Sequence, residues 1–128
     1  MVMKRLPWLV LAAVLPLSSC KDPAKFTRPT AEDIGRYRAV ALNDLKSSSA
    51  GETCAILVYG SASALDGGAA APEMIVETAA GQMVTGYLKT IGATELVVSI
   101  PFRDASGVMT RKEIVVPRRM VKEFRLKE

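Results

Sequence analysis

The stretch that decides the fold is residues 74–126, MIVETAAGQMVTGYLKTIGATELVVSIPFRDASGVMTRKEIVVPRRMVKEFRL. Its apolar and β-branched residues fall into short runs that are separated by turn-forming residues, a pattern typical of β-strands joined by tight connections. The runs predict five strands, over residues 74–78, 82–91, 95–102, 108–116 and 121–127.

The connections between these strands have recognisable turn chemistry. Gly81 follows two alanines and can adopt the left-handed backbone of a hairpin loop, and residues 103–107 (RDASG) predict a second hairpin. Pro117 cannot donate a hydrogen bond to a sheet, so we expect a tight break there. Phe124 and Leu126 then point to the same face of the last strand. Short strands joined in this way predict a small, strongly bent barrel.

A helix is predicted to begin after Thr30, because Thr30 can cap it and Asp33 lies three residues further on. Apolar residues at spacings of three and four make one stripe, formed by Ile34, Tyr37, Ala41 and Leu45. We expect this stripe to pack on the domain as a lid rather than to bind a partner. Residues 47–51 end the helix, and a buried strand over 54–59 and a loop over 60–72 follow.

Residues 74–126 resemble an Sm-like or SH3-like barrel. The resembling pieces are residues 75–78 with Gly81, 84–88 and 114–121. Gly86 would lie where the second strand bends sharply and a side chain would crowd the barrel. The small Sm-like lipoproteins of bacterial envelopes, whose function is largely undefined, are similar as well. The resemblance implies a mainly β domain behind one N-terminal helix, to which the strand over 54–59 is an addition.

The N-terminus has the pattern of an export signal. Lys4 and Arg5 make a basic start, and an almost unbroken apolar run follows over residues 6–17. This run is shorter than the roughly 20 apolar residues that a membrane-spanning helix needs. A basic head, a short apolar segment and small residues after it predict a signal peptide.

The end of that signal, Leu17-Ser18-Ser19-Cys20, resembles the lipobox of bacterial lipoproteins. The resemblance implies cleavage between Ser19 and Cys20, a diacylglycerol on the Cys20 sulfur and an acyl chain, such as palmitate, on its amine. Lys21 stands where an aspartate would resemble the enterobacterial signal for retention in the inner membrane. The resemblance therefore implies an outer-membrane anchor, with the protein facing the periplasm. The alternative is an ordinary signal peptide or a short uncleaved anchor with an incidental cysteine.

Three regions follow from these patterns: a lipoprotein signal peptide over residues 1–19, a lipidated tether over 20–29, and a helix with a small β-barrel over 30–128. The tether is polar and contains two prolines, which favours extended chain. The whole chain has 128 residues, of which 49% are hydrophobic, so it has room for a single modest domain.

Composition also limits the chemistry. The chain has no histidine, which removes the commonest general base and the commonest metal ligand. Apart from Cys20 there is one cysteine, Cys54, and its apolar neighbours predict a buried small side chain rather than a nucleophile. An intermolecular disulfide stays open in an oxidising periplasm. We expect no enzyme, no metal and no cofactor besides the covalent lipid.

The C-terminal region is basic. Residues 103–128 contain eight Lys or Arg and four Asp or Glu, an excess of four positive charges. The candidate residues for an anionic surface are Arg111, Lys112, Arg118, Arg119, Lys122 and Arg125, with Lys127 beside them. A solvated outer face is the simplest interpretation. Contact with anionic lipid or an acidic envelope polymer is a second one. Sm-like proteins of the cytoplasm bind RNA, but export and sparse aromatic residues make nucleic acid a remote third.

Together these observations predict a lipid-anchored envelope protein with a structural or protein-interaction role, whose partners are the membrane and an unknown envelope protein. The alternative is a binding module that uses the basic C-terminal face.

Overall fold

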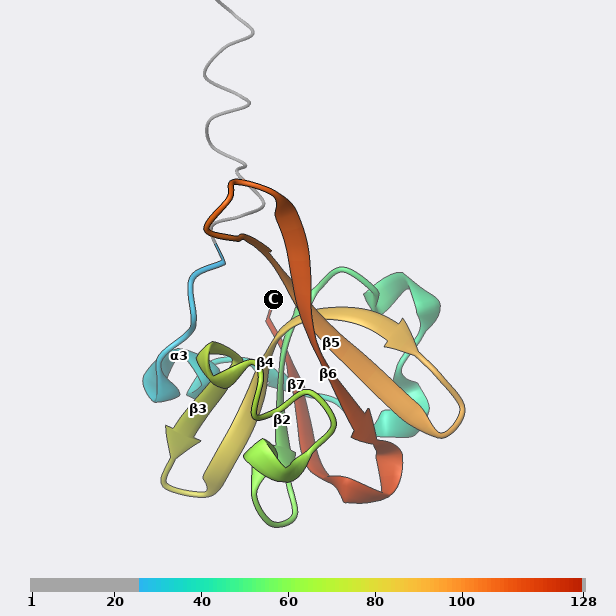
Figure 1. Ribbon diagram of the computed structural model, residues 1–128. Helices are drawn as coiled ribbons and strands as arrows, with labels where there is room; N and C mark the ends of the chain where they lie inside the picture. Colours follow the sequence, from blue (N-terminus) through green and yellow to red (C-terminus); the bar gives the residue numbers. More distant parts are fainter. Residues whose placement is uncertain (1–25, 128) are drawn as a thin grey trace, which may run out of the picture.

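The computed structural model describes residues 26–127, and these form a mainly β domain. Seven strands make one antiparallel sheet (Figure 1). The strands are β1 (Arg38–Ala39), β2 (Thr53–Val58), β3 (Ile75–Thr78), β4 (Gly81–Ile91), β5 (Glu95–Arg103), β6 (Met109–Pro117) and β7 (Val121–Leu126). Within the described residues one short α-helix, α3 (Ala31–Gly35), precedes them, and single 3-10 turns occupy several loops. The mainly β class and the strands expected after residue 53 are confirmed.

The order of the strands in the sheet is β1-β7-β2-β4-β5-β6, and β3 pairs with β4 beside this path. The long strand β4 joins the parts, since it pairs with β2, β3 and β5 along different parts of its length. Among the described residues, β6 pairs with neither β1 nor β7, so the sheet does not close through its strands. The outer edge of β6 instead meets one isolated bridge, between Asp66 and Val115.

The strand over 54–59, expected to be an addition to the barrel, lies at the centre of the sheet between β7 and β4 as β2. Its five residues from Cys54 to Val58 are all buried. Cys54, Ile56 and Val58 belong to the main core, and Ala55 and Leu57 belong to a second, smaller cluster. Strands that are buried on both faces have continuous rather than alternating apolar sequences, and this explains the run of β2.

The helix predicted to extend from Thr30 to Leu45 is wrong in its length, because α3 ends at Gly35. Its predicted capping box is confirmed: the Asp33 N–H donates to Thr30 Oγ1, and the Thr30 N–H donates to Asp33 Oδ2, both at 3.1 Å. Beyond the helix the chain becomes extended and pairs with β7, where the Val40 N–H donates to the Phe124 carbonyl at 2.9 Å. Hydrogen bonds to a sheet edge thus replace those of a longer helix.

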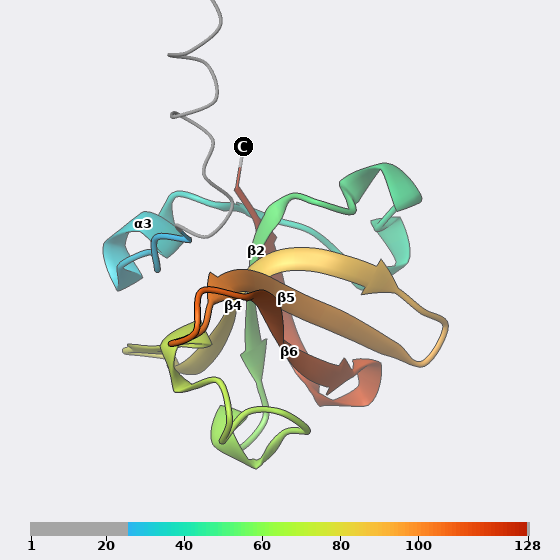
Figure 2. The same ribbon diagram turned by 45° about the horizontal axis from the view of Figure 1, so that its top comes forward.

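The predicted apolar stripe is consequently divided between two places. Ile34, with Tyr37 against it, packs in the small cluster with Ala55 and Leu57, and Leu45 packs against the main core. Figure 1 and Figure 2 show α3 at one side of the sheet and the segment with residues 42–50 at the other.

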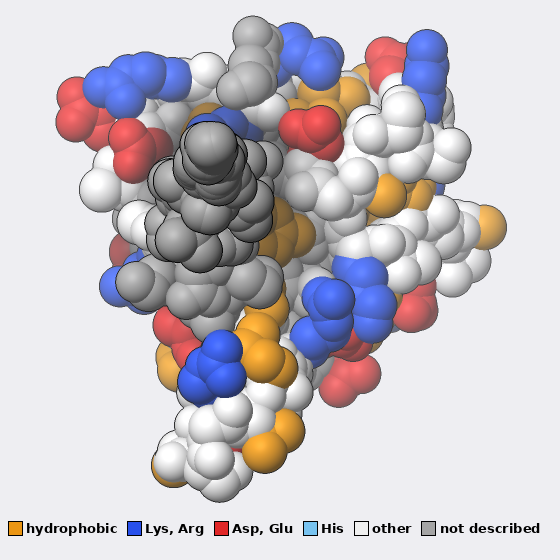
Figure 3. Space-filling model, turned by 90° about the horizontal axis from the view of Figure 1, so that it is seen from above, with side chains coloured by type: hydrophobic (Ala, Val, Ile, Leu, Met, Phe, Trp, Pro, Cys, Tyr) orange, Lys and Arg blue, Asp and Glu red, His pale blue; other side chains and the backbone are white. Residues whose placement is uncertain are grey.

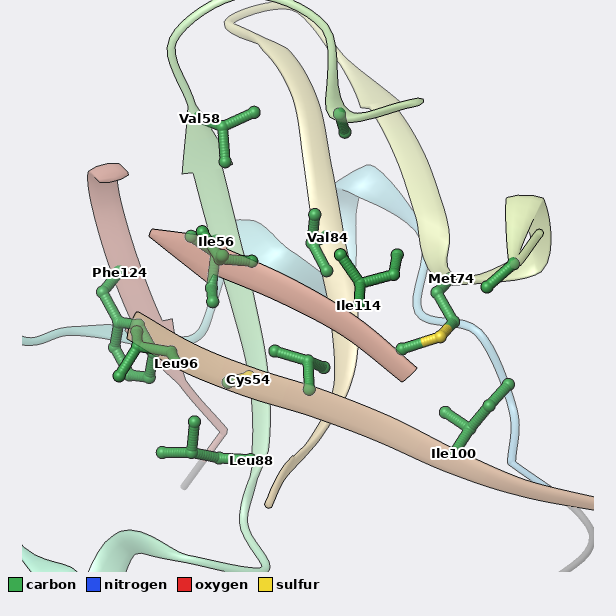
Figure 4. Close-up of a cluster of buried hydrophobic side chains, with 14 of the residues drawn as sticks. Cys54, Ile56, Val58, Met74, Val84, Leu88, Leu96, Ile100, Ile114 and Phe124 are labelled. Carbon is green, nitrogen blue, oxygen red and sulfur yellow. The ribbon is translucent and has the colours of Figure 1, made fainter. Parts of the chain in front are cut away.

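The main core lies within the curve of the sheet, and side chains from five strands meet there (Figure 4). The fully buried members include Ile56 from β2, Val84 from β4, Leu96 from β5 and Ile114 from β6. Phe124 and Leu126 of β7 are also buried, as expected for two residues on one face.

The signal peptide over 1–19, the lipobox with Cys20 and the tether as far as residue 25 lie outside the described residues. Residues 26–29, assigned by sequence to the tether, contact the domain. Pro29 is buried, and the Phe26 ring meets the Tyr87 ring edge-on with centroids 5.5 Å apart.

Gly86 lies where β4 changes its pairing from β2 to β5. Its φ is +155°, and a Cβ built there would lie 2.7 Å from Val98 Cγ1 and 3.1 Å from Met74 Cε. The expectation that a side chain at this position would crowd the core is confirmed.

Gly86→Ala should therefore lower the free energy of unfolding of the full chain by about 2 kcal/mol, since an added methyl group must displace packed core atoms. Urea unfolding followed by circular dichroism measures this. Gly35→Ala is the matched control, because no atom lies within 4 Å of the added Cβ at that position. Equal effects of the two substitutions would contradict the crowding at Gly86.

Candidate interaction surface

The six candidate basic residues lie on three parts of the fold. Arg111 and Lys112 are near the start of β6, Arg118 and Arg119 are in the turn after its end, and Lys122 and Arg125 are on β7. Arg111 and Arg118 are seven residues apart along extended chain, which corresponds to about 20 Å. Figure 3 likewise shows Lys and Arg side chains scattered among Asp and Glu over the face that it presents. The structure does not bring the six residues together on one surface.

Lys112 is neutralised by a partner from another part of the chain. Its Nζ forms a salt bridge with Glu73 Oε2 and lies 4.8 Å from the centroid of the Phe102 ring. Burial by itself raises the pKa of Glu73, but the hydrogen bond from Lys112 and a further backbone hydrogen bond outweigh it, so the pKa lies below its ordinary value. Lys112 therefore links β6 to the loop before β3.

Two arginines bind carbonyl groups of their own domain. Arg118 Nε donates to the Gly92 carbonyl at 2.8 Å, which ties the turn after β6 to the β4–β5 connection. Arg125 Nη1 donates to the Tyr37 carbonyl at 3.0 Å, and its Nε lies 2.7 Å from Glu123 Oε2. Both side chains are half-buried, so their charges hold segments of the fold together.

The other three basic residues are exposed. Arg111 is at the limit of hydrogen bonding, with 3.5 Å between its Nη1 and Ser99 Oγ. The side chains of Arg119 and Lys122 make no hydrogen bond or ion pair with any described residue. These two lie close in sequence at the end of β6 and the start of β7, and they are the cations most available to a partner.

Tyr59 lies at the same end of the sheet and was not singled out by the sequence. Its ring is exposed, with 54% of the residue accessible, and its N–H donates to the Met120 carbonyl at 2.9 Å. Met120 lies between Arg119 and Lys122 in sequence, so Tyr59 and the two unpaired cations come from backbone segments that are hydrogen-bonded to each other. We call Tyr59, Arg119 and Lys122 the turn-end surface. The predicted buried strand over 54–59 is wrong at this residue, because β2 ends at Val58 and Tyr59 is exposed.

A second exposed apolar pair lies at the tip of the β5–β6 hairpin. Val108 is 56% exposed and Met109 is 40% exposed. Sequence alternation places Val108 on the same face of the predicted strand as Ile114, which is buried. The hairpin, however, extends past the core, and β6 begins only at Met109.

The side chain of Asp104 fixes the shape of this tip. Its Oδ1 accepts hydrogen bonds from the Ser106 hydroxyl at 2.7 Å, the Ser106 N–H at 2.9 Å and the Val108 N–H at 2.9 Å. These bonds, the Ser106 hydroxyl first, lower the pKa of Asp104. Arg103 Nη1 closes the loop by donating to the Gly107 carbonyl at 3.0 Å.

Cys54 and the hollow beside α3 are the remaining candidates for a reactive or ligand-binding site. Cys54 is completely buried, and burial raises its pKa to about 12, so the thiol stays protonated and inaccessible. An open hollow of about 390 Å³ lies beside α3, but its Asp33 and Arg36 already pair at 3.2 Å. Within residues 26–127 no three His, Cys, Asp or Glu side chains gather as a metal site would require. No helix in this part of the chain has the length and apolarity to cross a membrane.

The chain matches no protein-family model, no curated protein and no solved structure. Function is therefore inferred from the residues and contacts described above.

The Glu73–Lys112 bridge predicts a pH dependence. Because the pKa of Glu73 is lowered by folding, its contribution to stability is present above the unfolded pKa of about 4.5 and is lost as pH falls below that value and through the folded pKa. Glu73→Gln should flatten this loss of stability in acid and cost less than about 1 kcal/mol at pH 7, since the bridge is partly exposed. Urea unfolding at pH 7 and at a series of lower pH values measures it.

Glu95→Gln is the matched control, because Glu95 is exposed and makes no ion pair with a described residue. An acid profile of Glu73→Gln that coincides with the wild-type profile would show that the bridge does not contribute.

Proposed function

We propose that this protein is a bacterial lipoprotein, anchored through lipid on Cys20, with a non-catalytic structural or protein-interaction role in the cell envelope. The observation that carries the proposal is the N-terminal sequence, in which a basic start and an apolar segment lead directly to Leu17-Ser18-Ser19-Cys20. Export places the domain among envelope components. The outer membrane is the favoured site because Lys21, not an aspartate, follows the cysteine.

The chemistry of the anchor fits this role. Each buried methylene contributes about 0.8 kcal/mol, so one acyl chain binds reversibly, whereas two or three hold a protein at the membrane. A thiol and a free amine on the same residue provide the attachment points for three chains. The six steps from Cys20 to Phe26 span at most about 20 Å, so the domain would stay close to the bilayer.

For the fold we propose a small Sm-like or SH3-like bent barrel. Three features support this: β4 pairs with strands on both of its edges, Gly86 permits close packing where that pairing changes, and one 3-10 turn (Arg118–Met120) separates β6 from β7. The central position of β2 extends the proposed barrel back to Thr53.

The turn-end surface favours a protein partner. Tyrosine and arginine are enriched at protein interfaces. An exposed ring or an unpaired cation can bind a partner there without first breaking hydrogen bonds within its own domain. Tyr59 and Arg119 meet that description, and Lys122 adds an unpaired cation, whereas Lys112, Arg118 and Arg125 are engaged within the domain. A binding module that uses the whole basic C-terminal region is therefore the weaker alternative. RNA binding is a weaker alternative still. Phe102 lies under Lys112 and Phe124 is buried, so that region of the described chain has no exposed aromatic ring on which bases could stack.

Labelling of growing cells with radioactive palmitate tests the anchor. The wild-type chain should incorporate the label, and Cys20→Ala should abolish incorporation, because no other residue offers the acylated thiol. Cys54→Ala is the matched control and should keep the label, since Cys54 is buried in the core. A label that persists in Cys20→Ala would disprove the lipoprotein proposal.

A photoreactive benzoylphenylalanine tests the interaction role. Placed at Tyr59 of the full-length chain, it should form crosslinks to envelope protein in cells, because this position is exposed and belongs to the turn-end surface. The same group in place of Lys89, which lies on β4 and pairs with Glu113 on β6, is the control and should give few. Absence of protein adducts at position 59, with salt-sensitive binding to acidic polymer instead, would favour the alternative.

A further inference from the structure

We infer that the tip of the β5–β6 hairpin is a second membrane contact, which docks on the anionic lipid surface that holds the Cys20 anchor. The inference rests on the proposed lipid anchor and adds an orientation to it. Val108 and Met109 would enter the interface between headgroups and acyl chains, and Arg103 and Arg111 would meet lipid phosphates.

The composition of the tip fits a bilayer surface. Val108 and Met109 are two of the three exposed large hydrophobic residues in the described chain, and they are adjacent. Arg103 pairs directly opposite Met109, and although its Nη1 donates to the Gly107 carbonyl, the residue is exposed, unlike the half-buried Arg118 and Arg125. Arg111, also exposed, lies two residues beyond Met109 on the same strand. Apolar side chains flanked by cations are the usual pattern of segments that bind an anionic membrane interface.

Acidic groups near the tip are outnumbered by its cations. The Asp104 carboxylate stays charged, since its three hydrogen bonds from within the loop lower its pKa, but Arg103 and Arg111 leave residues 103–111 with one net positive charge. The same three bonds order the loop that carries Val108. The next acidic residue, Glu113, forms a salt bridge with Lys89. A loop that is already ordered loses little conformational entropy when it docks.

The tip is also within reach of the anchored membrane. Phe26 contacts Tyr87, Tyr87 pairs with Ser99, and Arg103 lies four residues further along β5, or about 13 Å away. A tether from Cys20 to Phe26 of at most about 20 Å spans a comparable distance. Figure 1 shows the orange hairpin extending beyond the rest of the sheet, at the end where the blue segment begins the described chain.

Two partly exposed apolar side chains would bind vesicles only weakly from solution. The anchor changes this, because it holds the tip at a high effective concentration beside the surface and makes the contact intramolecular. The opposite end of the sheet, with Tyr59 and the β3–β4 turn, lacks this advantage since β6 runs nine residues between the two ends.

Tryptophan fluorescence in brominated vesicles tests the inference. The full-length chain with Trp8→Phe carries no other tryptophan, so Ala105→Trp places a single probe at the tip and Ala80→Trp places one in the β3–β4 turn. Each protein is purified from bacterial membranes and reconstituted into vesicles of brominated phosphatidylcholine and phosphatidylglycerol. Quenching at position 105 should exceed quenching at position 80 by about two-fold or more, because bromine lies in the acyl region that only the tip would approach.

Val108→Ser with Met109→Ser, added to the Ala105→Trp protein, should reduce quenching to the level of position 80. Equal quenching at both positions, or quenching at 105 that survives the two serines, would overturn the inference, since tryptophan itself partitions into interfaces. Mass spectrometry of the same samples reads acylation of Cys20 separately. Acylated protein without quenching at 105 would refute the tip contact alone, quenching without acylation would refute the lipid anchor alone, and protein that does not enter vesicles would refute both.

Discussion

The close approach of Val98, Met74 and Ile100 to the backbone of Gly86 is the contact on which the rest of the structure depends. Strand β4 has to pair with β2 and β3 through its first half and with β5 through its second. A side chain at the position where the pairing changes would occupy the space that these core residues fill. Without that space the strands would pack less closely around one core, and the cover that buries both faces of β2 would be weakened. The burial of Cys54, with its raised pKa, follows from the same arrangement.

The strands could be predicted from sequence because their signals are local. Alternating apolar residues, Gly81, Gly107 and Pro117 mark where each strand starts and stops, and the backbone adopts a left-handed conformation at both glycines. The order of the strands in the sheet could not be predicted, because it depends on pairing between segments that are distant in sequence. The predicted length of the helix after Thr30 was wrong for a related reason. Its capping box depends on local sequence and was predicted correctly, but its end is set by hydrogen bonds to β7, a strand some 85 residues further along.

The candidate surface shows the same division between local and long-range information. Basic residues can be counted in a sequence, but the partners that engage them cannot be read from it. Lys112 pairs with Glu73, 39 positions away, and Arg125 binds the Tyr37 carbonyl, 88 positions away. Half of the six candidates therefore hold the fold together instead of facing a partner. Exposure of Val108 was hidden in a different way, because its alternation matches that of the buried Ile114. The two residues differ in exposure because the hairpin is long enough to carry Val108 past the core, whereas Ile114 lies within it.

The two exposed apolar sites lie at opposite ends of β6, and this gives the domain a polarity. If Cys20 and the hairpin tip both contact the bilayer, two points of attachment restrict rotation of the domain about its tether. The turn-end surface then faces away from the membrane, because the nine residues of β6 separate it from the tip. A lipid anchor alone would leave Tyr59 and Arg119 sampling all directions, with a corresponding entropic cost when a partner binds. Fixing the domain in advance removes part of that cost, so an orienting hairpin would strengthen an interaction at the far end without touching the partner.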